Sequence, residues 1–141
     1  MARILAIDYG TKRTGIAVTD PLQIIANGLD TLATEKVLDF LQNYLSQEEV
    51  ETIVVGEPMH WDDSPAQIAP QVNTFVQKLR ALFPTVTIVM QDERFTSQDA
   101  KKIILQSGAK KKKRQDKSLV DKVSAILILQ EYLEKTRYQN S

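Results

Sequence analysis

Apolar residues in this chain gather into short runs that predict five β-strands. Residues 3–9 and 14–19 are two such runs, and the short linker GTKR between them favours an antiparallel hairpin. The stretch 22–32 predicts a third strand with a weak middle at Asn27 and Gly28. The last two predicted strands span 52–58 and 85–91.

Other segments carry helical signals. Apolar residues in 34–48 recur three and four positions apart, which predicts an amphipathic helix. Ser64, followed by Pro65 and Gln67, predicts the start of a helix that runs to about Phe83. The remaining predicted segments are a helix over 97–107 that ends at Gly108, a polar loop over 109–117 and a final helix over 119–134.

The order of these elements predicts an α/β fold. The first three strands follow one another directly, as in an antiparallel meander, whereas the later strands alternate with helices. That alternation favours parallel strands joined by crossover helices. Without an internal repeat or a long linker, the chain is expected to form one domain over 1–141. The prediction is a mixed five-stranded sheet flanked by helices.

Composition narrows the possible chemistry. The chain has no cysteine, which excludes disulfides, thiolate metal sites and a cysteine nucleophile. Its one histidine, His60, argues against a Ser-His-Asp hydrolase or a histidine-rich zinc site. No apolar run approaches the roughly 20 residues that a membrane helix needs. The N-terminus lacks the plan of a signal peptide, so we expect a cytoplasmic protein without a membrane partner.

Positive charge is concentrated in one segment although the formal net charge is zero. Such a run favours contact with nucleic acid when it lies on one face, but it is equally typical of a solvated loop. Both interpretations stay open from the run alone. Its residues are Lys110, Lys111, Lys112, Lys113 and Arg114.

Acidic residues follow three of the predicted strands. Asp8 ends the first strand, Glu57 ends the fourth, and Asp92 and Glu93 follow the fifth. Functional sites of open α/β sheets lie at the carboxyl ends of parallel strands. If these strands are parallel neighbours, the acids meet at one edge, and Asp121 in the first turn of the last helix could reach it.

Clustered carboxylates raise one another's pKa unless a cation offsets their charge. Mg²⁺ suits such a cluster because it prefers oxygen ligands, and two metal ions about 4 Å apart support phosphodiester cleavage. Simpler roles remain open for each acid. Asp8 could open a turn, Glu93 could pair with basic neighbours, and Asp121 could cap a helix together with Ser118.

Four motifs together resemble the YqgF family of Holliday-junction-resolvase-like nucleases. They are IDYGTKRTGIAVTD at 7–20, VVGEP at 54–58, QDERFTS at 91–97 and DKVSAILILQEYL at 121–133. The resemblance covers nearly the whole chain. It departs at the loop MHWDDSPAQ, where the family usually has a glycine, and at Ser124-Ala125, where the family usually has two alanines.

The resemblance implies a ribonuclease H-like fold and a cytoplasmic bacterial enzyme that processes the 5′ end of precursor 16S ribosomal RNA. It also implies cleavage that depends on Mg²⁺ or Mn²⁺, with Asp8, Glu93 and Asp121 as catalytic metal ligands. Arg13 and Arg94 occupy basic motif positions that are expected to contact phosphate, together with Lys12 and the 110–114 run.

Three alternatives remain. Branched DNA is a possible substrate because the same chemistry cleaves both polymers. A non-catalytic RNA-binding factor for ribosome assembly is compatible with a nuclease-like fold. The motif Asp-x-Gly after a strand also resembles the first phosphate loop of the sugar-kinase superfamily, but those proteins need two such domains and this chain is too short for them.

Overall fold

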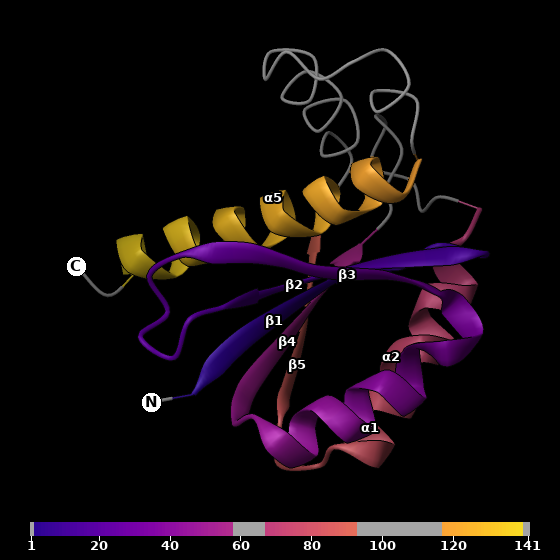
Figure 1. Cartoon of the computed structure of the whole chain (residues 1–141), viewed down its shortest axis with the longest axis horizontal. Helices are drawn as coiled ribbons and strands as arrows, with labels where there is room; N and C mark the ends of the chain where they lie inside the picture. The colour runs from indigo at the N-terminus through magenta and orange to yellow at the C-terminus, as the bar shows by residue number, and fades with distance from the viewer. Residues whose placement is uncertain (1, 58–66, 93–116, 140–141) are drawn as a thin grey trace.

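The computed structural model describes residues 2–57, 67–92 and 117–139, with only the backbone described for 117–121 and 137–139. Five strands form one sheet in the order β3-β2-β1-β4-β5 (Figure 1). The strands are β1 (Arg3–Asp8), β2 (Arg13–Thr19), β3 (Ala26–Ala33), β4 (Val50–Glu57) and β5 (Thr87–Asp92).

The strand directions agree with the sequence pattern. β1 pairs antiparallel with β2, which pairs antiparallel with β3, and these three strands form the predicted meander. β4 runs parallel to both β1 and β5, as expected for strands joined by crossover helices. The predicted mixed five-stranded α/β sheet is therefore confirmed, with β1 at its centre.

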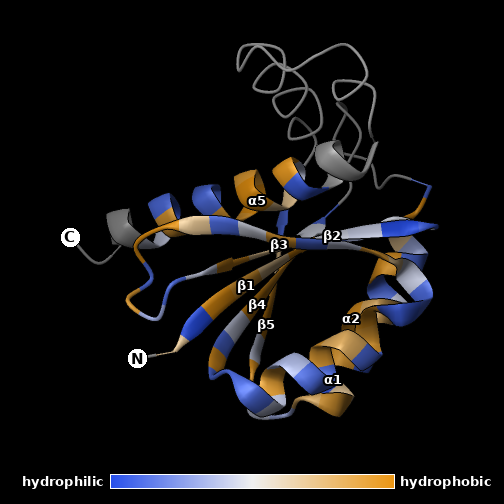
Figure 2. Cartoon of the chain, viewed as in Figure 1, coloured by the Kyte–Doolittle hydropathy of each residue, from blue (hydrophilic) through white to orange (hydrophobic). Residues whose placement is uncertain are grey.

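Helices cover both faces of the sheet (Figure 1). One face packs against α5 (Lys117–Gln139), and the other against α1 (Val37–Gln47) and α2 (Ala69–Leu82). We call these the α5 face and the α1–α2 face. Figure 2 shows hydrophobic residues along the central strands and on the helices that cover them. Strand β1 serves both cores, because Leu5 and Ile7 pack on the α1–α2 face and Ile4 and Ala6 on the α5 face.

The third strand begins at Ala26, later than the predicted start at 22. The preceding residues form a turn because the Asp20 carboxylate accepts hydrogen bonds from the backbone N–H groups of Leu22, Ile24 and Ile25, at 3.2, 2.9 and 2.8 Å. These bonds, the one from Ile25 foremost, hold the pKa of Asp20 below its usual 3.8. Ile24 and Ile25 are exposed, so their hydrophobicity gave a false strand signal.

The helix boundaries also differ from the sequence prediction. A 3₁₀ turn, η1 (Thr34–Lys36), precedes α1, whereas one helix was expected over 34–48. Helix α2 begins at Ala69, after a turn at 67–68, so the start predicted from Pro65 was too early, and Ser64 itself lies outside the described residues. Helix α5 is described from Lys117 onward, so Ser118 lies within the helix instead of before it. The helix expected over 97–107 lies outside the described residues.

No helix in the described ranges combines the length and the apolar character needed to cross a membrane. The longest of these helices is α5. Its apolar residues pack on the sheet, where Ala125, Ile128 and Leu129 are fully buried.

Ser124 is a polar defect in the packing of α5. Its side chain is 1% exposed, and its Oγ atom has no hydrogen-bond partner within the described part of the chain. A buried hydroxyl without a partner costs about 1 to 3 kcal/mol. We therefore expect Ser124→Ala to raise the free energy of unfolding by at least about 1 kcal/mol, which corresponds to a melting temperature roughly 2–4 °C higher.

Thermal unfolding of the variant beside the parent protein measures this effect. Ser46→Ala is the matched control, because Ser46 is exposed on α1 and donates to the carbonyl of Asn43 at 2.6 Å. The control gains helix propensity without removing an unpaired group, so it should change stability by less than about 0.5 kcal/mol. A lower melting temperature for Ser124→Ala would contradict the account of Ser124.

Candidate active site

Asp8 is the last residue of the central strand and is half-buried. Side chains alternate between the two faces of a strand, so Asp8 shares the α5 face with Ile4 and Ala6. Its Cα partner on β2 is Gly15, and the corresponding position on β4 is Gly56, directly after the partner of Ile7. Neither neighbouring strand therefore adds a side chain to the α5 face beside Asp8.

Two other acids lie at the same edge of the sheet but on its opposite face. Glu57 and Asp92 end β4 and β5 and are Cα partners. Residues two positions apart on a strand lie on the same face, so Glu57 shares a face with Val55 and Asp92 with Met90. Val55 and Met90 pack in the core of the α1–α2 face. Asp8, Glu57 and Asp92 therefore end their strands at the same edge of the sheet, as expected. The side chains of Glu57 and Asp92, however, lie on the opposite face from that of Asp8.

The described residues contain no group of three or more acidic or histidine side chains that could hold a metal ion. Glu93 and Arg94 lie outside them, as does the basic run 110–114. The backbone of Asp121 lies in α5, the helix that covers the face of Asp8, while its side chain is outside the described set. Among the predicted site residues, the structure thus describes the side chains of Asp8, Lys12 and Arg13.

Gln91 links β5 to α5 from the α5 face of the sheet. Its side chain is buried, and Nε2 donates to the backbone carbonyl of Ile128 at 2.9 Å and to Oε2 of Glu131 at 3.4 Å. The residue lies two positions before Glu93 in the sequence. Sequence reasoning missed this contact; the only signal was one amide at an alternate position of an otherwise apolar strand.

The hairpin that follows Asp8 is held by threonines that the sequence analysis did not single out. The Thr34 hydroxyl donates to the Gly10 carbonyl at 2.6 Å, and the hydroxyls of Thr14 and Thr34 are 2.9 Å apart. The backbone N–H of Thr34 also donates to the carbonyl of Lys12 at 3.0 Å. These bonds fix the turn that carries Lys12 and Arg13, whose side chains are exposed beside the end of β1.

Comparison with known proteins places these features in a family. A family model described as the RuvX Holliday junction resolvase matches residues 2–135. A relative from Flavobacterium johnsoniae is 48% identical over 138 residues, which are 98% of this chain and 100% of the relative. One from Phocaeicola vulgatus is 51% identical over 138 residues, 98% of this chain and 99% of the relative. Both carry the name "Putative pre-16S rRNA nuclease".

A solved structure shares the arrangement of strands and helices. The RuvC protein of T. thermophilus, in complex with a Holliday junction substrate, aligns with a TM-score of 0.57 over 96% of each chain. The two sequences are 14% identical, so this likeness concerns the fold. The fold is ribonuclease H-like, as the motifs implied.

Proposed function

Since the chain belongs to the RuvX family, in agreement with the YqgF resemblance of its motifs, we propose that it is a nuclease that processes the 5′ end of precursor 16S ribosomal RNA. The names of its relatives support this function. In this proposal residues 1–141 act as one nuclease domain in the cytoplasm. The main structural support for the site is the position of Asp8. It places a carboxylate at the carboxyl end of the central strand, on the face covered by α5.

We assign Asp8, Glu93 and Asp121 as the catalytic carboxylates. Every second side chain of a strand lies on the same face, and Val89 and Gln91 lie on the α5 face of β5. If this alternation continues for two more residues, Glu93 lies on the α5 face as well. Asp121 belongs to the helix that covers this face. By the same period Asp92 belongs to the opposite face, so the alternation distinguishes two adjacent acids that the sequence alone placed together.

The donor set suits Mg²⁺ or Mn²⁺, because carboxylate oxygens are the ligands that these hard cations prefer. Asp8, Glu93 and Asp121 would hold the ion. A bound divalent cation supplies positive charge that offsets the carboxylates and the scissile phosphate and lowers the pKa of water.

Basic residues beside Asp8 are proposed to position the substrate. Lys12 and Arg13 lie on the hairpin turn, which the Thr34 hydrogen bonds fix relative to β1. Guanidinium groups bind phosphate through paired hydrogen bonds, which suits Arg13 to a phosphate next to the cleaved one. Phosphates further along the RNA would be held by Arg94 and by the basic run Lys110, Lys111, Lys112, Lys113 and Arg114.

Cleavage of a labelled RNA that spans the 5′ end of the precursor tests this function. We expect cleavage in Mg²⁺ or Mn²⁺ that stops when EDTA removes the metal. Precursor small-subunit particles serve as a second form of the substrate, because ribosomal particles are proposed partners.

A four-way DNA junction tested in parallel separates the alternatives. Cleavage of the junction but not of the RNA would make the chain a DNA resolvase, as the description of its family suggests. Tight RNA binding by the folded protein, without cleavage of free RNA, particles or DNA in any divalent ion, would favour a non-catalytic assembly factor.

A further inference from the structure

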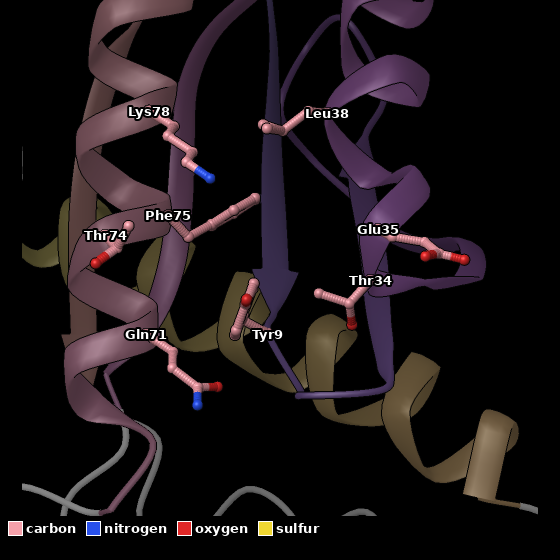
Figure 3. A pocket seen from close by; sticks show the side chains of 8 residues that line it. All are labelled: Tyr9, Thr34, Glu35, Leu38, Gln71, Thr74, Phe75 and Lys78. Atoms are coloured by element: carbon pink, nitrogen blue, oxygen red, sulfur yellow. The ribbon is translucent and has the colours of Figure 1, made fainter.

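A cavity of about 210 Å³ lies between α1 and α2, at the end of the sheet where β1 stops (Figure 3). Tyr9 lines it and directly follows Asp8 in the chain. The strand alternation places these neighbours on opposite faces, with Asp8 toward α5 and Tyr9 toward α2, where it packs against Phe75. A residue that lines the cavity, Tyr9, is therefore the direct neighbour in the chain of the proposed catalytic residue Asp8.

The walls combine aromatic surface with hydrogen-bonding groups. The Tyr9 and Phe75 rings have centroids 4.8 Å apart with planes tilted by 38°. Gln71 and Lys78, both exposed, stand two turns apart on α2. Figure 3 shows the Gln71 amide and the Lys78 amine directed into the space between the helices, and the Glu35 carboxylate directed away from it.

The cavity is also tied to the turn after Asp8. Thr34 lines it, and the same hydroxyl donates to the Gly10 carbonyl. Gly10 in turn follows Tyr9. A ligand in the cavity would thus contact Tyr9, at the start of the turn that carries Lys12 and Arg13, and Thr34, which is hydrogen-bonded to that turn.

We propose that this cavity binds one unpaired base of the nucleic-acid substrate, beside the phosphate that is cleaved. This inference rests on the proposed nuclease function. Aromatic side chains stack on any base, and an amide such as Gln71 can both donate to and accept from a base edge. The volume is below the roughly 300 Å³ of pockets for drug-sized ligands, which suits a single ring system. Lys78 would meet a phosphate of the same nucleotide.

Binding of a fluorescent single-stranded RNA without divalent metal tests the proposal independently of cleavage. Tyr9→Leu keeps apolar contact with Phe75 but removes the stacking surface, so we expect affinity to fall about 5- to 100-fold. Tyr9→Phe retains the ring and should stay within about twofold of the parent. A fully paired RNA of the same length, which offers no unpaired base, should bind all three proteins about equally.

An abasic scan of the RNA makes the test sharper. Removing the base at one position should weaken binding to the parent protein by a similar factor and should cost Tyr9→Leu little more. If Tyr9→Leu does not fold, Gln71→Ala, an exposed change on α2, takes its place in the same scan. Uniform effects at every abasic position, or unchanged RNA affinity in the variants, would overturn the base site. Cleavage by the parent protein in the same preparation would show that the nuclease function stands even then.

Discussion

Asp8→Asn should lower the rate of RNA cleavage by at least about 100-fold while leaving RNA affinity within about threefold. Removing one group that stabilises charge at a reacting centre costs about 10² to 10³ in rate, and a charged metal ligand should cost no less. The substitution keeps the size of the side chain at the end of β1 but removes its negative charge. Single-turnover cleavage measures the rate, and fluorescence anisotropy measures the affinity.

A matched acidic position controls for loss of charge in general. Asp39 is exposed in the first turn of α1 and does not line the cavity between α1 and α2, so Asp39→Asn should cleave like the parent. Unchanged cleavage by a purified Asp8→Asn protein would remove Asp8 from the catalytic site. An equal loss of cleavage and of affinity would make Asp8 a residue for binding only.

Gly10→Ala should destabilise the protein by about 1 to 3 kcal/mol, a melting temperature roughly 3 to 10 °C lower, and should reduce cleavage at least about tenfold. A Cβ atom at position 10 would lie far inside the van der Waals contact distance of the Arg13 backbone carbonyl oxygen. Because this neighbour is backbone, the hairpin itself must move. That movement would shift Lys12 and Arg13 relative to Asp8.

Gly28→Ala is the comparison for this effect. A Cβ atom there meets flexible side-chain atoms, the Lys122 Cγ at 2.7 Å and Cδ at 2.8 Å, and the Ile126 Cδ1 at 3.2 Å. The Lys122 stem must shift to make room, which costs less than moving backbone, so stability should fall by less than in Gly10→Ala, by about 1 kcal/mol at most. Thermal unfolding and cleavage of both variants check the pair. Equal stability of Gly10→Ala and Gly28→Ala would mean that the turn tolerates a side chain.

The central strands and their acids were predictable because their signals are local. β1 and β4 are nearly continuous apolar runs, which is typical of strands buried on both faces. The position of Asp8 at the carboxyl end of such a run identified the candidate site directly. Asp92 lies on the opposite face from Asp8 because side chains alternate between the two faces of a strand. This could be worked out only once the pairing of β4 with β5 was known.

Other features depend on contacts between distant residues and gave no local signal. Thr14 and Thr34 are 20 positions apart, and Gln91 and Ile128 are 37 apart, yet these pairs fix the hairpin and dock α5. The start of β3 was misplaced because the Asp20 side chain competes successfully for backbone N–H groups that a strand would otherwise use. Pattern alone does not reveal this competition.

We propose that the catalytic carboxylates gather on the α5 face of the sheet. The most direct test compares cleavage by Glu93→Gln and Asp92→Asn, two neutral and nearly isosteric changes at adjacent positions, over a range of Mg²⁺ concentrations. We expect Glu93→Gln to lose at least about 100-fold in rate at every Mg²⁺ concentration, and Asp92→Asn to stay within about threefold of the parent. Loss of cleavage in Asp92→Asn with retention in Glu93→Gln would contradict this proposal and would move the site to the α1–α2 face.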